Sequence, residues 1–287
     1  MDYVMAISST MLLAIYVSFS KKYQTTEGTG MVAGLRYAAM EGLFSALLFW
    51  ALSNFKFTFS AFSLIMAFVL ALFSDIQLLI GFQIMKRENM AVYTLFSMSG
   101  SMLLPYIFGV VFLEEDISFF RVLGLILILI AIAFSNRTKN KSSTGVYLLC
   151  TAVFILSGLV SVVSKCHQIN VINAPVDSTT FVMYTGVCKF VLCTIAFVFC
   201  KKGNKIFGFY NKGAFWIIPL SALIGSITYL LQLNGAKTLP ATVLYPIITG
   251  GGIVSSAFAG KVLFGEKLTK EQTISVLLCF IGTFMFL

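Results

Sequence analysis

The chain of 287 residues is strongly apolar: hydrophobic residues make up 59% of it, charged residues only 11%, and its mean hydropathy is +0.95. Soluble domains carry roughly 25% charged residues, so the composition excludes a soluble enzyme and indicates an integral membrane protein. The net charge of +9 comes from basic residues spread over several loops, a distribution that membrane topology explains without a nucleic-acid partner.

Ten apolar runs follow one another along the chain, each long enough or nearly long enough to cross a bilayer as a helix. The runs are continuous and do not alternate with polar residues, which argues against the strands of a membrane barrel. The sequence therefore predicts an all-α integral membrane protein of about ten transmembrane helices, without a soluble domain. The predicted runs cover residues 3–20, 31–52, 60–84, 90–112, 118–135, 145–164, 179–200, 214–235, 241–263 and 270–287. We interpret the first run as a retained span, because no basic segment or cleavage site accompanies it.

A short motif occurs twice, about half the chain apart. Residues 111–117 read V-F-L-E-E-D-I and residues 262–268 read V-L-F-G-E-K-L, so Glu115 and Glu266 correspond at an offset of 151 (266 minus 115). Each copy leads into another apolar run, which predicts two repeats, residues 1–135 and 145–287, joined by the polar and basic linker 136–144. Because five spans are an odd number, the second repeat enters the membrane inverted. Inverted repeats are common in secondary transporters that alternate access to a site at the midplane.

The basic residues predict the orientation of the chain. Of the 20 Lys and Arg residues, 14 follow odd-numbered runs, 4 follow even-numbered runs and 2 lie inside runs. Basic residues near span ends stay on the cytoplasmic side. We therefore expect an inner or plasma membrane protein with both termini outside and the linker 136–144 in the cytoplasm.

These features support a family resemblance. In each half, a run of small and polar residues is followed by an acidic turn, Phe112-Leu-Glu-Glu-Asp-Ile117 or Phe264-Gly-Glu-Lys-Leu268, and then by an apolar run that ends in small residues. This pattern, found twice, resembles the EamA repeat of the ten-span members of the drug/metabolite transporter superfamily. The resemblance implies a cavity surrounded by runs 1–4 and 6–9, with runs 5 and 10 at its edge. It also implies transport of a metabolite, most commonly efflux.

The first acidic turn departs from the family pattern because it holds three carboxylates, Glu114, Glu115 and Asp116. Glu115 and Glu266 precede runs 5 and 10, where we expect them to cap the N-termini of those helices. A gating or coupling role is the alternative. The three carboxylates are also the acidic cluster that a membrane-embedded enzyme, the alternative class of function, would use.

Four ionisable residues fall inside the predicted spans: Arg36 and Glu41 in run 2, Asp75 in run 3 and Lys189 in run 7. A charge at the bilayer centre costs roughly 2.5–3.5 kcal/mol on insertion scales, so such groups face a wet cavity or one another. Arg36 lies near the end of its run and is either a surface anchor or a site residue. Glu41 and Lys189 lie on equivalent runs. They form either a structural ion pair or a site in which Lys189 receives an anionic group while Glu41 or Asp75 receives a cation or a proton.

Polar residues at helical spacing outline the rest of the predicted cavity. They are Tyr93 and Ser97 in run 4, Tyr229 and Gln232 in run 8, and Tyr245 and Thr249 in run 9. A hydroxyl-rich cavity with few charges suits a small amphipathic metabolite, such as an amino acid or an organic cation. Nucleotide sugars and phosphorylated metabolites, the alternative substrates, call for more convergent cations.

We expect no cofactor and no metal. The chain has one histidine, its six cysteines are scattered, and no metal-ligand spacing or P-loop motif is present. The predicted partners are a small-molecule substrate and the lipid bilayer. The sequence leaves open proton coupling or exchange, and whether the protein is a monomer or a homodimer. A channel is a third class, distinguished by flux that does not saturate.

Overall fold

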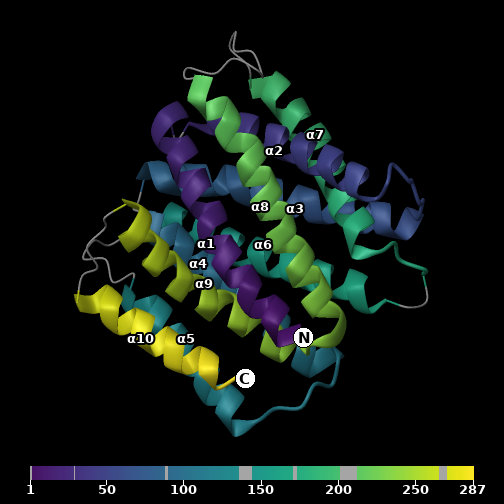
Figure 1. Cartoon of the computed structure of the whole chain (residues 1–287). Helices are drawn as coiled ribbons and strands as arrows, with labels where there is room; N and C mark the ends of the chain where they lie inside the picture. The colour runs from purple at the N-terminus through teal and green to yellow at the C-terminus, as the bar shows by residue number, and fades with distance from the viewer. Residues whose placement is uncertain are drawn as a thin grey trace.

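The computed structural model describes residues 2–28, 30–87, 90–135, 144–170, 173–200, 212–264 and 270–287, which form ten helices and no strand (Figure 1). The linker residues 136–143 and Glu266 lie outside the described residues. The first half holds α1 (Asp2–Glu27), α2 (Met31–Leu52), α3 (Ala61–Arg87), α4 (Met90–Phe112) and α5 (Phe119–Ser135). The second half holds α6 (Thr144–Ile169), α7 (Ser178–Cys200), α8 (Lys212–Thr238), α9 (Ala241–Phe264) and α10 (Lys270–Phe284).

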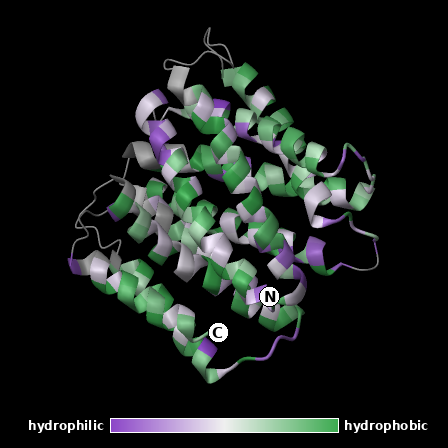
Figure 2. Ribbon diagram, in the orientation of Figure 1, coloured by the Kyte–Doolittle hydropathy of each residue, from purple (hydrophilic) through white to green (hydrophobic). Residues whose placement is uncertain are grey.

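Each of the ten helices overlaps one of the ten predicted runs, and the prediction of an all-α membrane protein is confirmed. Seven of the described helices contain an apolar stretch long enough to cross a membrane, and α4, α5 and α10 contain shorter apolar stretches. Hydrophobic residues make up most of the helices, whereas the most hydrophilic residues gather mainly near helix ends and in loops (Figure 2). Large apolar side chains that face outward, such as Phe199 and Trp216, would be costly in water and are favourable in lipid.

The most extensive contacts between helices cross from one half of the chain to the other. α2 packs on α7, α1 on α8 and α9, α4 on α6, and α5 on α10. The counterpart of each helix lies five places away in the helix order. The contacts equivalent to α1–α8 and α1–α9 are therefore α6–α3 and α6–α4, and both are present. The two halves are therefore interleaved, and each helix uses partners equivalent to those of its counterpart.

Glycines allow two of these inter-half contacts to be unusually close. A Cβ atom on Gly42 of α2 would lie 2.7 Å from the carbonyl oxygen of Gly186 on α7, and one on Gly186 would lie 2.9 Å from the carbonyl oxygen of Gly42. Gly124 of α5 and Gly282 of α10 repeat this arrangement at 2.7 and 2.9 Å. Small residues let membrane helices approach closely. The α2–α7 contact places Glu41 beside Lys189, because these residues flank the crossing.

The N-terminus of α7 is fixed by its preceding residue, Asp177. The carboxylate of Asp177 accepts hydrogen bonds from the backbone N–H groups of Thr179 and Thr180, at 3.0 and 3.2 Å, and from the hydroxyl of Thr180 at 2.6 Å. Burial raises the pKa of Asp177, but the hydrogen bonds from Thr180 and Thr179 lower it by more, so its pKa lies below the ordinary value. This is the usual N-cap arrangement, and it holds the start of the helix that carries Lys189.

Candidate functional site

A cavity of about 270 Å³ lies at the α2–α7 crossing. Its described lining comes from α1, α2 and α3 of the first half and from their counterparts α6, α7 and α8 of the second. Glu41 and Lys189 are the charged residues of that lining. The polar ones are Tyr16, Ser45, Ser74, Thr185, Ser226, Thr228, Tyr229 and Gln232.

Glu41 and Lys189 form an ion pair at the wall of this cavity. The Lys189 Nζ atom donates a hydrogen bond of 2.6 Å to Oε2 of Glu41. The side chain of Lys189 is 27% exposed and that of Glu41 only 8%, so the ammonium group is the partner that is more open to the cavity. The hydroxyl of Tyr16 also interacts with the Glu41 carboxylate. The structure thus brings together the two charges that the sequence places on equivalent runs.

Asp75 follows the lining residue Ser74 in the sequence of α3 and is 7% exposed. Its carboxylate faces the Lys189 ammonium and the Cys193 thiol. Neither carboxylate oxygen makes a regular hydrogen bond within the described part of the chain. Asp75 is therefore a buried acid next to the cavity, with a cation nearby that is bonded to another carboxylate.

Arg36 does not reach the cavity. Its Nη1 atom lies 3.3 Å from Oε2 of Glu27 on α1, and both side chains are buried, at 4% and 0% exposure. The guanidinium also lies over the ring of Phe197, 6.0 Å from its centroid. Arg36 is therefore neither a surface anchor nor a cavity residue, the two roles that the sequence left open. Arg36 ties the end of α1 to α2 and α7.

Tyr229 and Gln232 line the cavity, as predicted from their spacing. The Tyr229 hydroxyl lies 3.0 Å from the hydroxyl of Ser164 on α6. Sequence reasoning missed other lining residues, among them Ser45 and Thr185. Ser45 lies one helical turn after Glu41 and Thr185 one turn before Lys189, so helical spacing from the charged residues is the signal that would have found them.

The other four predicted cavity residues, Tyr93, Ser97, Tyr245 and Thr249, are not among the residues that line this cavity. The Ser97 hydroxyl accepts a 2.9 Å hydrogen bond from the Gln77 side chain, which joins α4 to α3. The Tyr245 hydroxyl donates to the backbone carbonyl of Ser161 at 2.5 Å and so joins α9 to α6. Tyr93 packs against Gly81 of α3, and Thr249 is buried in α9. These side chains connect α4 and α9 to their neighbours.

Glu115 does not cap α5, and that prediction is wrong. Its carboxylate accepts hydrogen bonds from the backbone N–H groups of Ala241 and Thr242, at 2.6 and 2.8 Å, and from the Thr242 hydroxyl at 2.8 Å. The Glu115 N–H donates to the Gly109 carbonyl, so the chain turns back over the end of α4 and the side chain points towards α9. Glu115 therefore caps the N-terminus of α9, in the other half of the chain.

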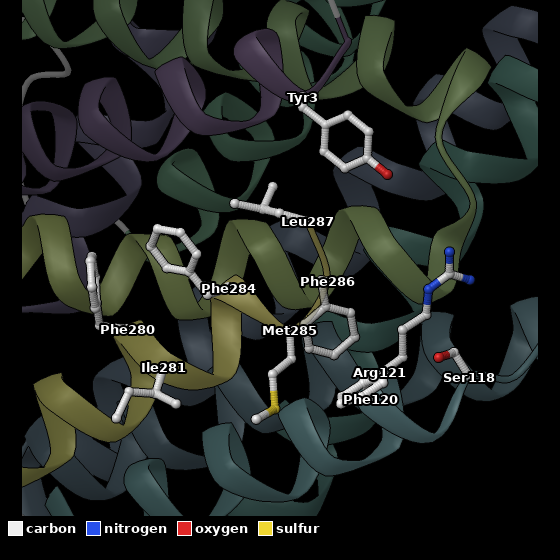
Figure 3. Close-up of a pocket in the computed structure, with 10 residues that line it drawn as sticks. All are labelled: Tyr3, Ser118, Phe120, Arg121, Phe280, Ile281, Phe284, Met285, Phe286 and Leu287. Atoms are coloured by element: carbon white, nitrogen blue, oxygen red, sulfur yellow. The ribbon is translucent and has the colours of Figure 1, made fainter.

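A second hollow of about 700 Å³ is lined by Tyr3 of α1 and by residues at the ends of α5 and α10. Aromatic side chains of α10 and the C-terminus run along it, and Arg121 and Ser118 mark one end (Figure 3). This hollow holds no paired charges in its described lining, and most of that lining comes from α5, α10 and the C-terminus. We therefore place the candidate site at the cavity with Glu41 and Lys189.

Comparisons with known proteins agree with this architecture. Residues 143–287 match the EamA-like transporter family. The spermidine export proteins MdtI of Enterobacter sp. (strain 638) and of Citrobacter koseri are each 34% identical to this chain over 95 residues, and that of Shigella flexneri is 32% identical. Each match covers 33% of this chain and 82% of the relative.

A solved crystal structure has the same fold, with a TM-score of 0.77 at 13% sequence identity, covering 99% of this chain and 97% of that one. The family match spans half of the chain, and the cavity and the apolar helices fit it. The chain belongs to the EamA-like transporter family and is a multi-pass membrane protein that transports small molecules.

Proposed function

We propose that this transporter exports a small amine by alternating access, and that Glu41 binds the ammonium group of the substrate. The observation that carries the proposal is the ion pair at the cavity wall. Glu41 already holds one ammonium group, that of Lys189, at 2.6 Å. A substrate ammonium that entered the cavity would compete for the same carboxylate with the same geometry.

The balance of charge favours an amine over a phosphorylated substrate. Two acidic side chains, Glu41 and Asp75, lie near the ammonium of Lys189, and Glu41 is the one that holds it. Phosphate groups are bound by clusters of donors and cations, and the described lining offers one cation. The MdtI relatives are named spermidine export proteins, which is consistent with an amine as substrate and with export as direction.

A neutral amino acid is the second candidate, because Lys189 is partly open to the cavity. If the substrate ammonium takes Glu41, the released Lys189 ammonium is free to bind a substrate carboxylate. The two candidates differ in their need for Lys189: a zwitterion uses both charges of the pair, whereas a simple amine uses only Glu41.

Counterflow into proteoliposomes tests both candidates, with labelled spermidine as the amine and labelled leucine as the zwitterion. Loss of a charge-assisted hydrogen bond costs roughly 1.5–3 kcal/mol, so we expect Glu41→Gln to slow transport of either substrate by about ten-fold or more. If the substrate is an amine, Lys189→Met should spare spermidine transport. If the substrate is a zwitterion, the same change should abolish leucine transport.

Glu114→Gln, a change to an exposed residue outside the cavity, is the matched control and should transport at the native rate. Native rates in Glu41→Gln, or no transport of either compound by the unmodified protein, would contradict the proposal.

We also propose that both termini face outside and that the linker 136–144 faces the cytoplasm. The distribution of Lys and Arg supports this orientation, and the two termini lie near the same end of the bundle (Figure 1). Protease added to intact cells should remove a tag at the N-terminus and leave a tag inserted in the linker. The reverse pattern would overturn the orientation.

A further inference from the structure

We propose that Asp75 is the proton-binding site of this transporter and that Lys189 is a switch that moves between Glu41 and Asp75. The inference rests on the proposed function, because it makes an amine the ligand that displaces Lys189 from Glu41. It adds to that function protons as the energy source for export and a coupling that applies to cationic substrates.

The first observation is that Asp75 is buried without a regular hydrogen bond. It is 7% exposed, and neither of its oxygens has a regular hydrogen-bond partner in the described residues. An ionised carboxylate in such surroundings loses its hydration, and the donors near it are the weak thiol of Cys193 and the Lys189 ammonium, which is already bonded to Glu41. The neutral acid avoids this cost, so the arrangement is that of a carboxyl group that carries its proton.

The second observation is the position of Lys189 between two acids. Lys189 is on α7, which packs against both α2 and α3. Its ammonium donates to Glu41 of α2 and faces Asp75 of α3. A lysine has a flexible stem and a compact charge, which suits it to exchange one carboxylate for the other. The thiols of Cys188 and Cys193, also on α7, are the other titratable groups near Asp75 in the described residues.

The charge balance links the proton to the substrate. In the structure, Glu41 is negative, Lys189 is positive and Asp75 with its proton is neutral, so the site has no net charge. When a monovalent amine binds Glu41, Lys189 moves to Asp75, the O–H bond of Asp75 breaks and its proton leaves through the cavity. The site then holds two negative and two positive charges and is again neutral, which a buried site favours.

The consequence is an exchange of one proton for one monovalent amine. A proton that enters Asp75 from outside returns Lys189 to Glu41 and expels the amine, so proton entry drives export. A zwitterion brings no net charge and would release no proton. Export of a cationic amine is therefore coupled to proton movement through Asp75, whereas export of a zwitterion is not.

Infrared spectroscopy of the purified protein without substrate tests the switch independently of the proposed function. A protonated carboxyl group has a carbonyl stretch distinct from that of a carboxylate, and it shifts in D₂O. We expect this band at neutral pH in the unmodified protein and its loss in Asp75→Asn. We also expect its loss in Glu41→Gln, because Lys189 then has no other partner and ionises Asp75.

Two further variants complete the test. The double variant Glu41→Gln with Lys189→Met should regain the band, because the cation that ionises Asp75 is gone, and this recovery excludes misfolding as the cause of the loss. Glu27→Gln, which removes a buried carboxylate bound to Arg36, is the control and should keep the band. A band that survives in Asp75→Asn, or one that survives in Glu41→Gln, would overturn the proposal.

Discussion

Single charged side chains satisfy helix ends that lie far from them in the sequence. Glu115 accepts from the first N–H groups of α9, while the Lys165 ammonium of α6 donates to the carbonyls of Ala236 and Leu239 at the end of α8, at 2.9 and 2.6 Å. Helix ends leave such groups without partners in the helix itself, and each charge has the sign that the helix dipole favours. The turn between α8 and α9 is therefore held from both sides by residues distant in sequence.

We expect Glu115→Gln to lower the free energy of unfolding by about 1–2 kcal/mol, because the amide keeps one acceptor and places its N–H₂ group against backbone donors. A fall in the thermal unfolding midpoint in detergent measures this loss. Glu114→Gln alters the exposed neighbouring residue and should leave the midpoint unchanged. Equal midpoints for the two variants would show that the contacts with α9 do not stabilise the fold.

The residues that sequence reasoning placed correctly are those whose burial is expensive. Glu41, Asp75 and Lys189 meet at the α2–α7 crossing because membrane charges need each other or water. Arg36 obeys the same rule, but its partner Glu27 was missed because α1 continues beyond the predicted run, which ends at residue 20. Apolar length predicts the part of a helix in hydrocarbon and says nothing of the part that extends past it.

The α2–α7 crossing is the element-level feature on which the cavity depends. Gly42 is adjacent to Glu41, and its missing Cβ leaves room for the carbonyl of Gly186 and the N–H of Phe190. Both are backbone atoms, which cannot turn aside as a side chain can. A shift of this crossing would therefore move Glu41 relative to Lys189.

Gly42→Ala should destabilise the protein by about 1–3 kcal/mol, as overpacking does in tightly packed interiors, and should also slow transport. A Cβ at Gly42 would lie 2.7 Å from the Gly186 oxygen and 2.8 Å from the Phe190 nitrogen, so the helices must separate. Gly145→Ala, at a position with no neighbour within 4 Å, is the control for the change itself. If both variants unfold and transport alike, the crossing is not tightly constrained.

The identity of the cavity helices was only partly predictable. Tyr93 and Tyr245 have the same spacing to small residues as a cavity stripe, yet that spacing also describes a helix packed closely on its neighbours. In the structure these tyrosines serve packing, whereas Tyr229 lines the cavity. Periodicity defines a face of a helix, and only the neighbouring helices decide whether that face meets a cavity or another backbone.

At the scale of the whole molecule, neither half is a separate domain. The main partners of α1 are α8 and α9, and those of α3 are α6 and α7. Such a bundle is what two copies of a shorter protein could build together, and the MdtI relatives are shorter, because 95 residues cover 82% of them and 33% of this chain. The linker thus connects parts that packing already holds together.

We expect residues 1–139 and 140–287, produced as two chains in one cell, to purify together through a tag on either chain and to transport as the intact protein does. The contacts across the halves bury the α2–α7 and α1–α8 faces, so each half alone should aggregate or be degraded. A stable, monodisperse single half in detergent would contradict the interleaved packing as the source of stability.

Interleaving also sets a sequence of events during synthesis. Glu41 and Asp75 enter the membrane with α2 and α3, whereas Lys189 arrives with α7, after more than a hundred further residues have been made. Until then Lys189 is absent, and ionised acids in hydrocarbon without a nearby cation are costly. The first half therefore enters the bilayer before Lys189 is present, and the arrival of α7 completes the ion pair between Lys189 and Glu41.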